Sequence, residues 1–149
     1  MAVNQDTYTD VMAPGYPGMV ANGETSNVIT RTCEDVGGIA FGVPVYRGVG
    51  DHGCTRTPSA NAFLGISVAH EVLGLLGGQT TDKYQQYDNV AILPLGVIWV
   101  LAGEAVTDGV QAYDTNAAIV DTVGSNTILP GWVFDTTGAN GALVKLAKR

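Results

Sequence analysis

Glycine and proline interrupt this chain so often that long helices are excluded. The 149 residues include 20 Gly and 6 Pro, the two residue types that destabilise a helix interior most. Between these breaks lie short runs rich in Val, Ile and aromatic residues, which favour strands. Many short strands separated by turn residues are typical of sandwiches and barrels. We therefore predict a mainly β fold, a small antiparallel β-sandwich or barrel of short strands with an extended N-terminal arm.

The strongest β signal lies in residues 82–100, which read DKYQQYDNVAILPLGVIWV. Two apolar runs, residues 89–93 and 97–101, are separated only by the Pro-Leu-Gly sequence of residues 94–96. Proline presets φ and glycine accepts positive φ, so this joint predicts a tight turn. We expect a β-hairpin here, at the centre of the core.

Two tyrosines, Tyr84 and Tyr87, precede this hairpin in a polar setting. One interpretation is that both rings close over one end of the core. The other is that they form an aromatic patch for a partner, because tyrosine combines a large apolar body with a polar tip. In the second case, Tyr84 and Tyr87 are the predicted contacts between copies of the chain.

The N-terminal segment, residues 1–22, contains two Pro-Gly pairs and has little periodicity. Such a stretch cannot be helical, and proline cannot donate to a central ladder. Terminal segments of this kind become ordered only when something holds them. We predict an extended arm over residues 1–22 and a single β-rich domain over residues 23–149. On the arm, Tyr8, Tyr16 and Met19 are the predicted partner contacts, and a disordered tail is the alternative.

The charge balance narrows the class of partner. Only 14% of the residues are charged, and the net charge is −7. A protein that tracks nucleic-acid phosphates needs a basic stripe, so we predict no nucleic-acid partner.

The chain has no apolar run near the ~20 residues of a membrane span, and its first residues do not resemble a signal peptide. We expect synthesis in the host cytoplasm, where free thiols are favoured over a disulfide.

Residues that carry metal or nucleophile chemistry are few. The chain has two cysteines, Cys33 and Cys54, and two histidines, His52 and His70, at spacings that match no zinc motif. His52 and Cys54 would share one face of a strand, so a small hydrolase is one alternative function. No nucleophile elbow or phosphate loop supports it. We predict no catalytic residue, no metal and no cofactor.

Several blocks of sequence together suggest a family. In chain order they are PGM (17–19), GIAFGVPV (38–45), RGVGDHGC (47–54), FLGISV (63–68), the stretch 82–100 and FDTTGANGALVKL (134–146). With this order, nearly the whole chain resembles the structural cement or capsid decoration proteins of tailed bacteriophages. The blocks DKYxQYDxxAIL and GDHGC are the most specific parts of the resemblance.

The resemblance implies a non-enzymatic virion component on the outer surface of the expanded capsid. Such proteins are small β-rich domains that clamp neighbouring major capsid subunits, often as trimers at threefold positions. The implied partners are the major capsid protein and two further copies of the chain, although a dimer is also compatible. We predict that Tyr8, Tyr16 and Met19 of the arm contact the capsid. The resemblance supplies no catalytic residues. A virion-surface module that binds host glycans through Trp99 or Trp132 remains the other alternative.

Overall fold

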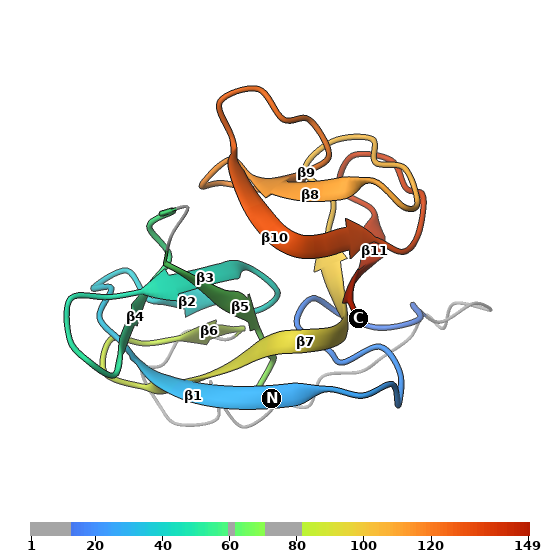
Figure 1. Ribbon diagram of the computed structural model, residues 1–149. Helices are drawn as coiled ribbons and strands as arrows, with labels where there is room; N and C mark the ends of the chain where they lie inside the picture. Colours follow the sequence, from blue (N-terminus) through green and yellow to red (C-terminus); the bar gives the residue numbers. More distant parts are fainter. Residues whose placement is uncertain (1–12, 60–61, 71–81) are drawn as a thin grey trace, which may run out of the picture.

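The structure is a computed structural model that describes residues 13–59, 62–70 and 82–149 (Figure 1). All regular secondary structure within these ranges is β, which confirms the predicted class. No helix in the described ranges is long and apolar enough to cross a membrane. The strands are β1 (Asn27–Cys33), β2 (Ile39–Ala40), β3 (Pro44–Arg47), β4 (Gly53–Thr55), β5 (Phe63–Ser67), β6 (Lys83–Tyr84), β7 (Asn89–Leu101), β8 (Gln111–Asp114), β9 (Ile119–Val120), β10 (Thr127–Phe134) and β11 (Leu143–Lys148).

Five strands form a closed barrel in the order β1-β4-β3-β5-β7, which β1 closes by pairing with β7. The predicted barrel is therefore confirmed. It is mixed rather than purely antiparallel, because β1 and β4 run parallel. A two-stranded sheet of β2 and β6 lies against the barrel (Figure 1). Closure removes the free edges that make an open sheet prone to pair with other chains.

The hairpin predicted over residues 89–101 is wrong, because these residues form the single long strand β7. The Pro-Leu-Gly sequence marks a change of partner instead of a turn. Up to Leu95, β7 pairs with β1, and from Gly96 onward it pairs with β11. The β1–β7 register shifts just before Leu95, and such a bulge tolerates a proline that has no N–H to donate.

The second half of β7 leads into a C-terminal sheet with strand order β7-β11-β10-β8-β9. In Figure 1 this sheet lies above the barrel, and β7 runs through both. The sheet curls back on itself, because Ile119 of β9 forms a parallel bridge with Ala102. The N–H of Gly103 donates to the carbonyl of Ile119 (2.8 Å) at this bridge. The C-terminal sheet is thus closed by one isolated bridge directly after β7.

Two apolar clusters hold the parts together. One contains seven buried residues and joins the barrel to Ile39 of β2 and Tyr84 of β6. The other contains fourteen, and joins Tyr46, Ile66 and Leu93 of the barrel to side chains of the C-terminal sheet. Burying apolar surface contributes about 25 cal/mol per Å². The second cluster is therefore the main apolar connection between barrel and sheet.

A buried polar network spans the same junction. Asp114 of β8 has a fully buried side chain and forms a bidentate ion pair with Arg56, at 2.6 and 2.7 Å. The hydroxyl of Tyr46 donates to the same carboxylate (2.7 Å). Burial, together with this hydrogen bond to a carboxylate, raises the pKa of Tyr46 far above its ordinary value. The network therefore fixes β8 against the barrel with every carboxylate oxygen in use.

Candidate functional site

The two residues of the hydrolase hypothesis, His52 and Cys54, are not arranged for catalysis. Cys54 is fully buried. Loss of hydration is the largest cause and charge repulsion from Cys33 the next, and together they raise the pKa of the Cys54 thiol to about 12. His52 is exposed, and its Nδ1 lies 3.4 Å from Nη1 of Arg31. A nucleophilic cysteine needs a lowered pKa and a partly exposed position. The hydrolase alternative is therefore wrong. Cys33 and Cys54 are free thiols in register on β1 and β4.

The tryptophans of the glycan hypothesis are also unsuitable. Trp132 is fully buried in the larger apolar cluster, and Trp99 is buried. Lys145 Nζ lies 5.4 Å from the centroid of the Trp99 ring, and the backbone at Gly15 packs against the same ring. A sugar-binding aromatic ring must present an open face, so neither tryptophan supports glycan binding.

The described part of the predicted arm is held by its own domain. Residues 16–19 form a turn in which the N–H of Met19 donates to the carbonyl of Tyr16 (3.1 Å). Gly18, at the third position, has φ +86°, which a type II turn requires. The next residues then run along β7: Trp99 donates to the carbonyl of Met19 (2.9 Å), and Val20 bridges Ile98. Tyr16 remains exposed and Met19 half-buried, while Tyr8 lies outside the described residues.

The two tyrosines predicted as oligomer contacts lie in opposite environments. Tyr84 is fully buried, with its ring edge-on to Phe41 and its hydroxyl donating to the carbonyl of Val68. The prediction is therefore wrong for Tyr84, which belongs to the core. Tyr87 is 77% exposed and has φ +71°, a left-handed conformation that is rare for an aromatic residue. Tyr87 thus remains a predicted contact.

Tyr87 belongs to a group of three exposed, largely apolar side chains on neighbouring loops, which we call the loop end. The other members are Val36, which is 84% exposed, and Val49, which is fully exposed at 101%. The three residues lie on three loops, residues 34–38, 48–52 and 85–88, at the end of the barrel where β1 finishes (Figure 1). Burying such side chains against a partner is favourable, so exposed apolar groups mark interaction sites.

Hydrogen bonds tie these loops to one another around Glu34. The Glu34 carboxylate accepts from the backbone N–H groups of Val49 (2.8 Å) and Gly50 (2.7 Å). Nε2 of Gln86 donates to the Glu34 carbonyl (3.2 Å), and the N–H of Tyr87 donates to the carbonyl of Cys33 (2.8 Å). The exposed apolar side chains therefore lie on loops that are held by hydrogen bonds, which lowers the entropy cost of binding.

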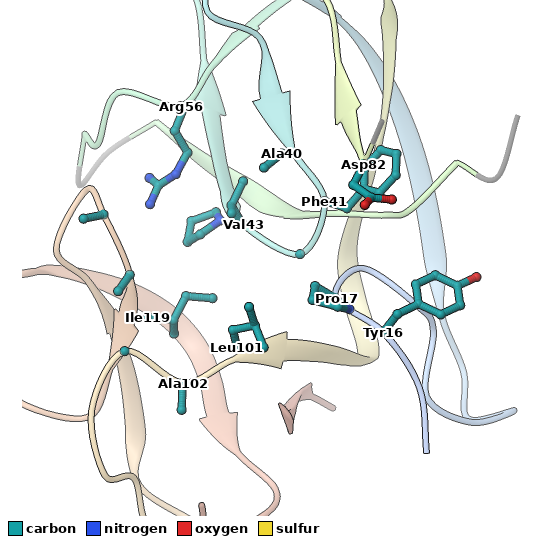
Figure 2. Close-up of a pocket in the computed structure, with 15 residues that line it drawn as sticks. Tyr16, Pro17, Ala40, Phe41, Val43, Arg56, Asp82, Leu101, Ala102 and Ile119 are labelled. Carbon is teal, nitrogen blue, oxygen red and sulfur yellow. The ribbon is translucent and has the colours of Figure 1, made fainter. Parts of the chain in front are cut away.

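A second surface is a groove between the barrel and the C-terminal sheet, shown in Figure 2. It has a volume of about 420 Å³ and is lined by residues 16–17, 40–44, 101–103 and 117–119, together with Arg56 and Asp82. Leu101 is 51% exposed there although it lies in a strand. One wall is the bridge that closes the C-terminal sheet, and the other is the β2–β3 connection with the turn at Tyr16.

Only two of the fifteen lining residues are charged, and they differ in how they are used. Both terminal nitrogens of Arg56 are engaged by Asp114, so its charge is compensated within the protein. Asp82 is exposed and lies with Tyr16 and Phe41 at the end of the groove opposite Arg56 (Figure 2). The groove therefore combines an apolar floor with one carboxylate at its mouth.

Comparison with known families decides the identity. The family model described as "Structural cement protein (E217 gp24/Pam3 gp6)" matches residues 4–148. The chain belongs to this family. The structural cement protein described here is accordingly a non-enzymatic component of the phage virion capsid, which confirms the resemblance seen in the sequence. A search of curated proteins gave no match.

Solved structures support the fold of this cement protein. It matches a chain of the capsid of Myoviridae Phage XM1 with a TM-score of 0.73 and 14% sequence identity, covering 99% of this chain and 97% of that one. A chain of the head fiber gp8.5 N base of bacteriophage phi29 matches with a TM-score of 0.48 and 16% identity, covering 84% and 95%. At its identity the first match establishes a shared fold, and the second is too weak to establish one.

Sequence reasoning named Tyr16 and Tyr87 as candidate contacts but missed the other residues of both surfaces. A usable signal existed for the loop end, because Val36 and Val49 are single valines within the polar, Gly-rich sequences EDVGG and RGVGD. An apolar residue in such a loop has no core position to fill. The groove carried no comparable signal, because its lining comes from four segments and two single residues that are separated in the chain.

Proposed function

We propose that this cement protein binds the outer face of the assembled capsid and clamps neighbouring major capsid subunits. The observation that supports the proposal is the presence of two separate exposed apolar surfaces, the loop end and the groove, which share no residue. A clamp built from several copies requires one surface that binds the capsid and a second that joins the copies to one another. A protein with only the first surface would cover the lattice without connecting its subunits.

In this proposal the two surfaces have different partners. The loop end, centred on Tyr87, joins copies of the cement protein into a trimer. The groove, which Tyr16 lines, contacts the capsid together with the neighbouring Met19. A trimer then holds three capsid contacts at once, and linked weak contacts bind far more tightly than one alone. Because the protein binds assembled lattice and not free subunits, it stabilises the shell by mass action, by about 3–4 kcal/mol per site well above the dissociation constant.

The test uses intact heads that lack the cement protein, with the purified full-length protein added back. We expect saturable co-sedimentation with the heads and a rise in the temperature at which the shells disrupt, measured by calorimetry. Binding to heads that are already closed examines the outer face directly. A protein that does not bind, or that binds without raising this temperature, contradicts the proposal.

A substitution at Tyr87 separates self-association from folding. Asn accepts φ +71° more readily than Tyr, so Tyr87→Asn is expected to keep or slightly raise fold stability. It is expected to abolish the trimer in analytical ultracentrifugation. Val123→Asn, at an exposed valine outside both surfaces, is the control and should leave the oligomeric state unchanged. A Tyr87→Asn protein that still sediments as the wild type rules out the loop end as the seam.

A further inference from the structure

We infer that the groove is the seat for an extended segment of the major capsid protein that carries an aliphatic side chain next to a lysine or arginine. This inference rests on the proposed function, since it names what the capsid presents to the groove. The volume of about 420 Å³ lies in the range of pockets that take a small ligand or a few side chains, and not a folded element.

The apolar residues on the floor of the groove indicate that the bound segment inserts an aliphatic side chain. Leu101 is 51% exposed on the floor of the groove, with Ile119 and Pro17 on either side and Val43 on the facing wall (Figure 2). The nearest cation, Arg56, is already paired with a buried carboxylate and has no uncompensated charge to offer. A charged or strongly polar side chain entering here would lose its hydration without a partner, which is unfavourable. An aliphatic side chain gains from the same burial.

The exposed carboxylate at the mouth of the groove indicates that the bound segment also carries a lysine or arginine. Asp82 lines the groove, is exposed, and lies at the end opposite Arg56 (Figure 2). The protein as a whole has a net charge of −7, which attracts a cationic partner and raises its association rate. A lysine or arginine beside the aliphatic residue would meet Asp82 while its neighbour enters the groove.

The first experiment alters the floor and uses a matched control. Leu101→Asp places a carboxylate in the groove, whereas Val28→Asp places one on β1 at a valine with the same 51% exposure that lies outside the groove lining. Binding to heads that lack the cement protein is measured by co-sedimentation. We expect Leu101→Asp to weaken binding about tenfold or more and Val28→Asp to leave it unchanged. Equal binding by both variants overturns the inference.

The second experiment alters the mouth. Asp82→Asn is expected to weaken binding at low salt and to reduce its salt dependence, because the proposed ion pair is exposed and therefore screened. Asn also accepts the left-handed backbone of Asp82 (φ +59°). Asp108→Asn makes the same charge change at an exposed turn outside the groove and is the control. If both variants lose the same amount of affinity, only the net charge matters, and the basic part of the inference is wrong.

The third experiment identifies the occupant. A photo-crosslinking amino acid at position 118, on the groove wall, is irradiated on decorated heads, and the linked peptides are sequenced by mass spectrometry. We expect one segment of the major capsid protein with an aliphatic residue adjacent to Lys or Arg. Crosslinks only to another copy of the cement protein overturn the inference. Wild-type protein that fails to bind heads contradicts the proposed function itself, which keeps the two failures distinguishable.

Discussion

The barrel and the C-terminal sheet both contain β7, but they are closed by very different amounts of hydrogen bonding. In the barrel, β1 and β7 pair through five residue pairs. In the C-terminal sheet, the return from β9 to the end of β7 consists of one bridge between Ala102 and Ile119. Local stability follows the number of bonds that must open together. The comparison indicates that the groove, which is lined by the weaker closure, lies on the more easily deformed part of the molecule.

The largest expected contrast concerns thiol reactivity in the barrel. The pKa of Cys54 is raised to about 12, so at pH 8 its thiolate population is roughly a thousandfold below that of an unfolded cysteine. We expect a thiol-specific reagent to label native protein at the rate of barrel opening only. Because the folded pKa exceeds the unfolded one, this thiol also lowers stability as the pH rises above about 9. Rapid labelling of native Cys54 would show that the barrel is not tightly closed.

The next largest effect concerns the polar network between barrel and sheet. Asp114→Ala leaves Arg56 and the Tyr46 hydroxyl without their shared partner, and breaking a buried ion pair costs about 3–5 kcal/mol. Chemical denaturation measures the loss. Asp121→Ala is the control, because Asp121 is partly exposed and accepts one hydrogen bond, from Thr107; it should cost below about 1 kcal/mol. Similar losses in both variants would mean that the network does not hold the two parts together.

Two glycine substitutions compare a packed point in the barrel wall with the closure of the C-terminal sheet. A Cβ at Gly65 of β5 would collide with the backbone carbonyl of Leu93, and one at Gly103 would collide with the methyl group of Ala118. Overpacking costs about 1–3 kcal/mol, and we expect Gly65→Ala at the upper end because a backbone in a closed barrel cannot yield. Gly103→Ala should instead speed amide exchange around Ile119. Gly37→Ala, which meets nothing within 4 Å, is the control for both.

The smallest effect is expected at the chain terminus. Arg149 pairs with Glu24 and Asp135 at 2.9 and 3.1 Å, and all three side chains are substantially exposed. These carboxylates raise the pKa of Arg149, which is charged in any case. Exposed ion pairs contribute little because water and salt screen them. Arg149→Ala should leave the thermal midpoint within experimental error, and a clear fall would show that the terminus contributes to holding the C-terminal sheet.

The sequence predicted the fold class well because turn residues and β-branched runs act locally. It failed at Pro94, where the same residues suit both a turn and a bulge, and only the partners on either side of β7 distinguish them. It also grouped Tyr84 with Tyr87, because spacing alone does not show that one ring enters the core and the other is held outward at positive φ. The groove depends on segments that meet only after folding, so no local pattern could have indicated it.

The uninterrupted course of β7 has a mechanical consequence. Tension applied to the C-terminal sheet would pass to the barrel along β7, which is paired with β1 and β5 in the barrel and with β11 in the sheet. A two-part protein joined by a loop would stretch at the joint before either part resisted. Here the joint is itself a hydrogen-bonded strand, so pulling the two parts away from each other requires the pairing along β7 to break.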